Sequence, residues 1–338
     1  MKIAVDAMGG DYAPHEIVKG ALVGAREHDV ELILVGQPQA IEAELAEVET
    51  RGIVFSLVEA PQVIGMEEHP AQAVRRKKGA SIVVATRLVG EGAADAVVTM
   101  GHTGAATIAA LWVLGPIEGI RRATIGTPYL GIQEQTFILD GGANVDCKPD
   151  HLLQFALMGS LYAERMMGMK NPTVALLSNG AEEGKGGRAI IEAFPLLAKS
   201  GLNFIGNIEG MDIPLGRANV VVIDGLVGNV VVKLTEGLTS RLLTVVEEEL
   251  ASILPSQALD SALRPALAEI RKRYHYSRIG GMPLLGVKGV VVIGHGRSKA
   301  PAVVSAMGQA KRAVESRLVE SIRAGWQELT KITASPGN

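Results

Sequence analysis

Residues 137–152 read FILDGGANVDCKPDHL, and this stretch decides the fold. A short apolar run ends at Asp140, two glycines follow, and Pro149 opens a helix-forming segment. A strand that turns on glycine into a helix is the unit of α/β proteins, which bind ligands at such strand ends. The backbone N–H groups at the helix start favour an anion. The stretch therefore predicts a ligand site at the edge of a sheet.

The same alternation runs through the chain. Short apolar, β-branched runs predict strands, and stretches with the helical period lie between them. The strands are expected at 2–5, 31–36, 52–58, 95–100, 137–140, 173–178, 203–206, 219–224 and 289–294. The helices are expected at 14–28, 38–50, 70–89, 103–114, 150–168, 187–200 and 299–332. This rhythm predicts a mainly parallel sheet covered by helices, and composition marks no boundary that would divide residues 1–338 into two domains.

One region, residues 230–276, departs from the rhythm because two helical stretches follow each other without a strand. It predicts a helical hairpin with Ile253, Leu254 and Pro255 at its tip. Such a hairpin suits a dimer interface. An apolar tip near basic residues also suits a lipid headgroup layer, and the two interpretations are compatible.

Composition narrows the class of protein. Of the 338 residues 47% are hydrophobic, which argues against disorder. A net charge of −3 and only 4% aromatic residues argue against a nucleic-acid partner. The single Cys147 leaves no disulfide framework or cysteine zinc cluster. We find neither a signal peptide nor an apolar run of the roughly 18 residues that span a bilayer, so a cytoplasmic protein is expected.

Small polar residues beside glycine recur where the predicted strands end. They are Asp6, Thr99, Asp140, Ser178, Asn207, Asp224 and His295. Turns need glycine in any α/β protein, but so many polar strand ends favour a shared binding site. If the strands form one parallel sheet, these loops converge along one edge.

The glycine loops do not match a nucleotide-binding motif. Residues 90–95, GEGAAD, precede a strand instead of following one, so they are no dinucleotide fingerprint. Residues 178–187, SNGAEEGKGG, resemble a P-loop with glycines spaced too closely and Gly186 in place of the magnesium-binding Ser or Thr. We interpret them as an anion-binding loop in which Lys185 supplies the cation, although a solvated surface lysine fits that motif equally well.

Cysteine and the metal-ligating side chains give weaker indications of a site. Cys147 lies near Lys148 and a helix start, which suits a nucleophile with His151 as its base, but a lone cysteine more often serves packing. The histidines and acids lack the spacing of a metal site, so no metal is expected.

Seven ordered blocks resemble the bacterial phosphate acyltransferase family. They lie at 6–21, 101–105, 139–159, 176–186, 206–213, 224–237 and 280–298, and include DAMGGD, GHTGA and DGLVGN. The chain departs from the family pattern at His102, where the family has Asn, and at Arg297-Ser298, where it has two serines. Neither departure removes a block.

The resemblance implies a three-layer α/β/α sandwich similar to isocitrate and isopropylmalate dehydrogenases, with two lobes around a cleft. It implies an enzyme that converts acyl-acyl carrier protein and inorganic phosphate to acyl phosphate for phospholipid synthesis, without a cofactor. It also implies a homodimer that associates peripherally with the membrane through the 230–276 hairpin and supplies a downstream acyltransferase.

That reaction needs a positioned phosphate and donors for the developing oxyanion, more than it needs a base. We therefore expect Lys185, Asn229 and His102 to be catalytic. The expected substrate-binding residues are Asp6, Gly9, Gly10, Thr103, Gly104, Asp140, Asn144, Asp146, Lys148, Ser178, Asn179, Gly180, Asn207, Glu209, Asp224 and Gly228. The hairpin and residues 280–287 are possible walls for an acyl chain, and Arg271, Lys272, Arg273 and Arg278 are candidates by charge for receiving an acidic carrier protein.

Two rival functions stay open at the level of sequence. An NAD-dependent decarboxylating dehydrogenase on the same fold would need a nucleotide site and clustered acidic metal ligands, which we do not find in the sequence. A non-catalytic membrane scaffold is suggested by the hairpin alone.

Overall fold

Two sheets form the framework of the computed structural model, which describes residues 1–129, 135–253, 259–274 and 278–334. The larger sheet has the strand order β3-β2-β1-β4-β12-β11-β5 and the smaller one β6-β7-β10-β8-β9. The larger sheet contains β1 (Lys2–Asp6), β2 (Glu31–Gly36), β3 (Phe55–Glu59), β4 (Ala96–Thr99), β5 (Thr124–Ile125), β11 (Gly281–Leu285) and β12 (Val290–Gly294). The smaller contains β6 (Thr127–Pro128), β7 (Phe137–Leu139), β8 (Val174–Leu177), β9 (Phe204–Ile208) and β10 (Val220–Val222).

Most neighbouring strands are parallel, as the sequence predicts. The register of β1 on β2 runs from Lys2 opposite Glu31 to Asp6 opposite Val35. In the smaller sheet Val220 of β10 lies between Phe137 and Val174. Only β11, β5 and β6 pair antiparallel to their neighbours within the described residues. The central parallel strands, such as β4 and β10, are buried on both faces, whereas the edge strands β3 and β9 are partly exposed.

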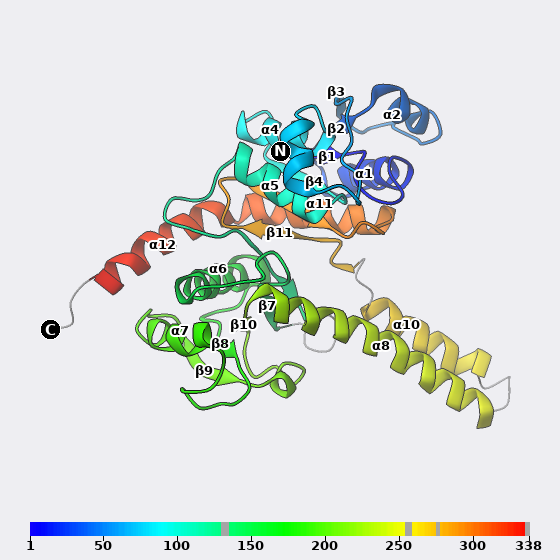
Figure 1. Cartoon of the computed structure of the whole chain (residues 1–338). Coiled ribbons are helices and arrows are strands. Elements are labelled where there is room, and N and C mark those ends of the chain that lie inside the picture. Colours follow the sequence, from blue (N-terminus) through cyan, green and yellow to red (C-terminus); the bar gives the residue numbers. More distant parts are fainter. Residues whose placement is uncertain (130–134, 254–258, 275–277, 335–338) are drawn as a thin grey trace.

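Helices cover both faces of the larger sheet, which makes it a three-layer sandwich (Figure 1). They are α1 (His15–His28), α2 (Pro38–Leu45), α3 (Pro70–Arg76), α4 (Ser81–Gly90), α5 (Thr103–Val113) and α11 (Ala300–Glu315). Ile3 and Val5 belong to one buried cluster with α1 and α11, whereas Ala4 belongs to another with α4 and α5. This split follows from the alternation of side chains along a strand.

The smaller sheet carries α6 (Pro149–Met167) and α7 (Arg188–Ala198), and the 3₁₀ turn η1 (Gly210–Asp212) follows β9. We call each sheet with its covering helices a lobe. The last helix, α12 (Leu318–Ala334), packs against α6 and so returns the chain to the smaller lobe. The chain first crosses from the larger to the smaller sheet between β5 and β6, at Gly126. A side chain at Gly126 would overlap the Phe137 ring, so this crossing requires glycine.

The structure corrects several sequence-based boundaries. The helix expected at 70–89 is two helices, since Lys77 leaves the helical conformation with φ −103° and ψ 68°. The helix expected at 299–332 is also two, separated by Arg317 at φ 53°. Strand β11 was missed because Pro283 and the flanking glycines disguise it, and its residues 281–285 are buried. That stretch belongs to the core, and residues 283–287 line a small apolar pocket beside β12.

Two helices project from the lobes (Figure 1): α8 (Gly225–Ile253) and α10 (Arg264–Tyr274), the latter preceded by a π-helical turn, η2 (Leu259–Leu263). Arg271 of α10 pairs with Glu247 of α8 at 2.7 Å, so the two helices lie side by side. Ile253 at the end of α8 is 74% exposed, while the predicted tip residues Leu254 and Pro255 lie outside the described residues. Within those residues, no helix combines the length and apolar character needed to cross a bilayer.

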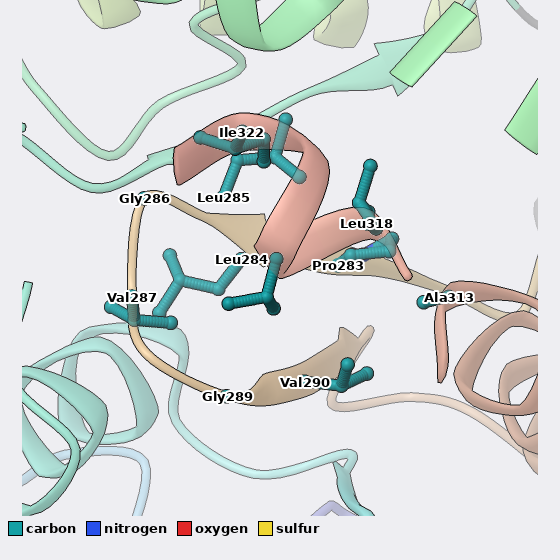
Figure 2. A pocket seen from close by; sticks show the side chains of 11 residues that line it. Pro283, Leu284, Leu285, Gly286, Val287, Gly289, Val290, Ala313, Leu318 and Ile322 are labelled. Carbon is teal, nitrogen blue, oxygen red and sulfur yellow. The ribbon is translucent and has the colours of Figure 1, made fainter. Parts of the chain in front are cut away.

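A small apolar pocket lies beside β11 and β12 (Figure 2). Leu284, Val290 and Ile322 are among the side chains that line it, and its cavity volume is only about 10 Å³. Ligand pockets usually measure about 300–1,000 Å³ and carry a few polar groups. The pocket also lies where β12 begins, whereas the polar loop at His295 follows the end of that strand. It is a packing feature and not part of the candidate site.

Candidate active site

The carboxyl edge of the larger sheet holds a buried carboxylate that joins two glycine loops. Asp6, at the end of β1, is 2% exposed and accepts a 2.7 Å hydrogen bond from Thr99, at the end of β4. Thr99 in turn accepts from the Gly101 N–H at 3.0 Å. Burial raises the pKa of Asp6, against hydrogen bonds from Ser81 and Thr99 that lower it. A side chain at Gly9 would lie 2.9 Å from the Gly101 nitrogen, so glycine lets the loops touch.

His102 caps helix α5 at this edge. Its Nδ1 accepts a 3.1 Å hydrogen bond from the Gly104 N–H. When the ring is neutral, Nε2 therefore carries the proton and can donate it to a substrate. Asn, the family residue at this position, is also a preferred helix cap, so His102 preserves the capping role. Thr103 is exposed beside it, at the first helical position.

The smaller sheet presents a second buried carboxylate, Asp140, in the turn after β7. Its Oδ1 accepts from the Gly142 and Ala143 N–H groups at 2.9 Å, and Oδ2 accepts from the Asn144 amide at 2.6 Å. The same Asn144 nitrogen also donates to the Ala123 carbonyl at 2.8 Å, beside strand β5. Burial raises the pKa of Asp140, against these hydrogen bonds. Asp140 and Asn144 therefore shape the loop and fix it to the larger sheet.

The start of α8 packs directly on this turn. Asp224 accepts hydrogen bonds from the Leu226 and Val227 N–H groups at 3.0 Å and so caps the helix. A side chain at Gly228 would overlap the Asp140 carbonyl oxygen. The exposed Asn229 follows and donates to the Gly141 carbonyl at 3.4 Å. Asn229 is thereby held at the surface of the turn.

The loop after β8 brings an exposed cation to the same edge. Strand β8 lies between β10 and β9, so Ser178 and Asp224 end neighbouring strands. A side chain at Gly180 would lie 2.9 Å from Cγ of Lys185, which shows that the stem of Lys185 passes over this glycine. Asn207 of β9 ties the loop down by donating to the Glu182 carbonyl at 2.8 Å. Among the described residues, no carboxylate forms an ion pair with the Lys185 ammonium.

Lys233, which the sequence did not single out, and His295, one of the polar strand ends, link α8 to the edge of the larger sheet. Lys233, one turn after Asn229 on α8, lies with its Nζ 3.4 Å from Nε2 of His295, in the loop after β12. Glu236 holds the same ammonium at 3.2 Å. Burial, then the charges of Lys233 and Arg297, lower the pKa of His295. The helical spacing of Asn229, Lys233 and Glu236 was the available signal, since residues three to four apart share a face.

Lys233→Met should raise the pKa of His295 towards its usual value, because it removes a neighbouring positive charge. A depressed folded-state pKa contributes stability above the unfolded pKa of about 6.5, and this is lost as the pH falls through the folded pKa. The variant should therefore lose less stability on acidification. An NMR titration of the imidazole Cε1–H signals, assigned with His295→Gln, measures the pKa. An unchanged pKa would mean that Lys233 and His295 do not pair in solution.

Cys147 is a packing residue in this arrangement. Its Sγ lies 3.7 Å from the Asn144 carbonyl oxygen. Burial raises the pKa of the thiol to about 12, helped by the charges of Asp140 and Asp224. Since the thiolate is the nucleophile, Cys147 is unreactive near neutral pH.

The structure thus groups the predicted residues into three loop clusters. At the larger sheet lie Asp6, Gly9, Gly10, His102, Thr103 and Gly104; at the turn before α6 and the start of α8 lie Asp140, Asn144, Asp224, Gly228 and Asn229; in the loop after β8 lie Ser178, Asn179, Gly180 and Lys185, joined by Asn207. Asp146 and Lys148 are exposed in the segment between the Asp140 turn and α6, and Glu209 caps η1 with Asp212. The expectation of one shared sheet edge is wrong, because the strand ends divide between two sheets.

The chemistry of these clusters suits an anion. They offer glycine N–H groups, two exposed ammonium groups and the Asn229 amide, and both buried carboxylates are occupied by loop hydrogen bonds. The described residues contain no group of three or more His, Cys, Asp or Glu side chains placed to hold a metal ion.

Comparison with known proteins assigns this architecture to a family. Residues 1–321 match a family model described as fatty acid synthesis protein. A phosphate acyltransferase of Pelotomaculum thermopropionicum is 49% identical over 338 residues, covering 100% of this chain and 98% of the relative. One from Desulfitobacterium hafniense is 51% identical over 337 residues, covering 99% of each chain.

Solved structures share the fold at low identity. A phosphotransacetylase from Streptococcus pyogenes superimposes with a TM-score of 0.60 at 17% identity, covering 93% of this chain and 94% of its own. A 4-hydroxythreonine-4-phosphate dehydrogenase from Klebsiella pneumoniae gives 0.54 at 14% identity, covering 93% and 98%. The predicted dehydrogenase-like α/β sandwich is confirmed.

Proposed function

Because the chain belongs to the phosphate acyltransferase family, we propose that it transfers the acyl group of an acyl-acyl carrier protein to inorganic phosphate. The enzyme class follows from family membership, and it displaces the dehydrogenase and scaffold alternatives. The carrier-protein donor, the product's use in phospholipid synthesis by a downstream acyltransferase, and a cytoplasmic location are parts of the proposal. The fatty-acid synthesis family match is consistent with all three.

In the proposed step, a phosphate oxygen attacks the thioester carbonyl. A C–O bond forms, the C–S bond breaks, and the carrier's thiolate takes up a proton. Phosphate is already anionic at neutral pH, so the protein's task is to hold it and to stabilise the oxyanion. The observation that carries the assignment is the exposed ammonium of Lys185 on a glycine loop, without an ion-pair partner in the described structure.

The geometry of each cluster supports the following roles. Lys185 and the loop N–H groups at 178–187 bind phosphate. Lys233 on α8 supplies a second positive charge for the anionic substrate. Asn229 donates to the thioester carbonyl oxygen, and His102 offers its Nε2 proton to the leaving sulfur. Direct attack by phosphate is favoured over an acyl-enzyme, because the Cys147 thiol is protonated.

The direct test is release of carrier thiol. Purified protein is mixed with acyl-carrier protein, and free thiol is followed with and without inorganic phosphate. We expect phosphate-dependent release together with acyl phosphate, trapped as its hydroxamate. Thiol release that is independent of phosphate would identify a thioesterase instead, and no release from any acyl donor would overturn the proposal.

We also propose that the enzyme works as a homodimer, with α8 in the interface. Residues four apart on α8 form an apolar ridge made of Leu226, Val230, Leu234, Leu238, Leu242 and Val246. Each exposes 44% to 60% of its surface. A ridge of this spacing packs into the groove of another helix, and a continuous exposed apolar patch marks an interface. The apolar Ile253 beyond the ridge supports peripheral membrane contact at the hairpin end.

Leu238→Glu should convert the dimer to a monomer, since it places a charge in the middle of the ridge. Sedimentation velocity measures the change, and the control is Thr239→Glu, which adds the same charge at the next position on α8, off the ridge. If Leu238→Glu sediments as the wild type does, the ridge is not the interface between copies.

A further inference from the structure

A second basic surface lies beside the larger sheet and plays no part in the steps above. Arg75, Arg76, Lys77 and Lys78 follow one another at the end of α3. Lys77 is occupied, because its ammonium pairs with Glu68 at 2.6 Å and donates to the Val63 carbonyl at 2.8 Å. Arg75, Arg76 and Lys78 are exposed. Arg87 of α4 joins them by donating to the Lys78 carbonyl at 3.3 Å.

We call Arg75, Arg76, Lys78 and Arg87 the basic rim. Within the described parts of the chain, no carboxylate forms an ion pair with any of its four side chains. The whole chain carries a net charge of −3, so this concentration of positive charge is local. Unpaired exposed cations on a weakly acidic protein create a field that attracts an acidic partner.

Both ends of the segment that carries the basic rim touch the candidate site. Pro70, where α3 begins, lies against Gly104, because a side chain at Gly104 would lie 3.1 Å from Pro70 Cγ. Ser81, where α4 begins, hydrogen-bonds to the Asp6 carboxylate. Helix α3 has seven residues and is therefore about 10 Å long. The rim thus lies about one short helix from the loops of Asp6 and His102.

The segment is also fixed in place. The Ser81 N–H donates to the Gln62 carbonyl at 3.0 Å, and Gln62 forms a parallel bridge with Ala80. The ion pair of Lys77 closes the other side of this loop. A docking partner therefore meets a preformed surface and pays little ordering entropy on the enzyme's side.

Arg271 on the hairpin is a weaker docking candidate, and the side chains of Lys272 and Arg273 lie outside what the structure describes. Arg271 already pairs with Glu247 at 2.7 Å, and Glu248 and Glu249 follow in the sequence. The hairpin also projects away from both lobes (Figure 1). A carrier bound at Arg271 would meet an existing ion pair, whereas the basic rim offers a positive surface next to the loops.

We propose that the basic rim is the docking surface for the acidic carrier protein that delivers the acyl thioester, an inference that rests on the proposed function. The rim attracts the carrier by charge, and the neighbouring loops of Asp6 and His102 receive its acylated arm. Complementary charge at such a surface acts mainly on association, so it raises the affinity for the carrier without entering the chemical step.

The test is the double variant Arg75→Glu/Arg76→Glu, with Lys170→Glu/Lys199→Glu as a control that makes the same charge change on exposed residues of the smaller lobe. We expect the Kd for the carrier protein, from isothermal titration, to weaken at least about tenfold in the rim variant alone. The kcat/KM with acyl-carrier protein should fall equally through KM, while kcat/KM with S-acyl-pantetheine stays within about twofold.

Direct binding separates the two proposals. If the wild type binds carrier protein through the rim but releases no thiol with phosphate, the proposed function fails and the docking surface stands. An unchanged Kd in a folded rim variant overturns the docking surface. A rim variant that loses binding to anionic phosphatidylglycerol vesicles, but keeps its Kd for the carrier, assigns the rim to a lipid surface and also overturns the proposal.

Discussion

Lys185→Ala should slow acyl phosphate formation at least about 100-fold while the protein stays folded, because removing one preorganised charge from a reacting centre costs about 10²–10³ in rate. The folded state should tolerate the change, since Lys185 is exposed and its ammonium has no ion-pair partner among the described residues. The measurement is phosphate-dependent thiol release at saturating acyl donor, together with a thermal melt.

Two control variants test whether the loss is specific to the charge of Lys185. Lys199→Ala removes an exposed lysine from the end of α7 and should leave the rate unchanged. Lys185→Arg keeps the charge and should recover part of the loss, with the shortfall reporting on geometry. If the loss lies in KM for phosphate alone, Lys185 binds phosphate equally in the ground and transition states. Wild-type turnover in folded Lys185→Ala would contradict the assignment.

The framework of the fold was predictable because its strands are apolar on both faces. Every predicted run, from residues 2–5 to 289–294, overlaps a strand of the structure, although several boundaries differ by one to three residues. The elements that were missed have a weak local signal. β5 and β6 have two residues each, and β11 contains Pro283. The helix break at Arg317 depends on a left-handed backbone conformation, and Arg317 is neither the glycine nor the proline that would mark such a break in the sequence.

The candidate site was predictable in position and less so in role. Asp6, Asp140 and Asp224 follow apolar runs, and each does end a strand or lie just beyond one. The sequence does not reveal that the carboxylates of Asp6 and Asp140 accept hydrogen bonds from nearby backbone and side-chain donors, because those contacts depend on loop geometry. The contact between Lys233 on α8 and His295 in the loop after β12 joins residues 62 apart in the sequence, and no local period encodes it.

Gly228→Ala should abolish most of the activity and destabilise the fold, because any side chain there overlaps the Asp140 carbonyl oxygen. The overlap involves backbone, so α8 must move away from the turn. Overpacking of this kind costs about 1–3 kcal/mol, and displacing a reacting group by about 1 Å can cost about 100-fold in rate. Asn229 and Lys233 would move with the helix. Urea unfolding and the thiol-release assay measure the two effects.

Gly237→Ala is the matched control, on the same helix three turns from its start. A side chain at Gly237 meets nothing within 4 Å, and the position is exposed. Alanine there should therefore stabilise the protein by about 0.5–1 kcal/mol through helix propensity and leave the rate unchanged. The same substitution on one helix thus has opposite effects on stability. If Gly228→Ala behaves like Gly237→Ala, α8 does not pack on the Asp140 turn in solution, and Asn229 is not held at the reacting thioester.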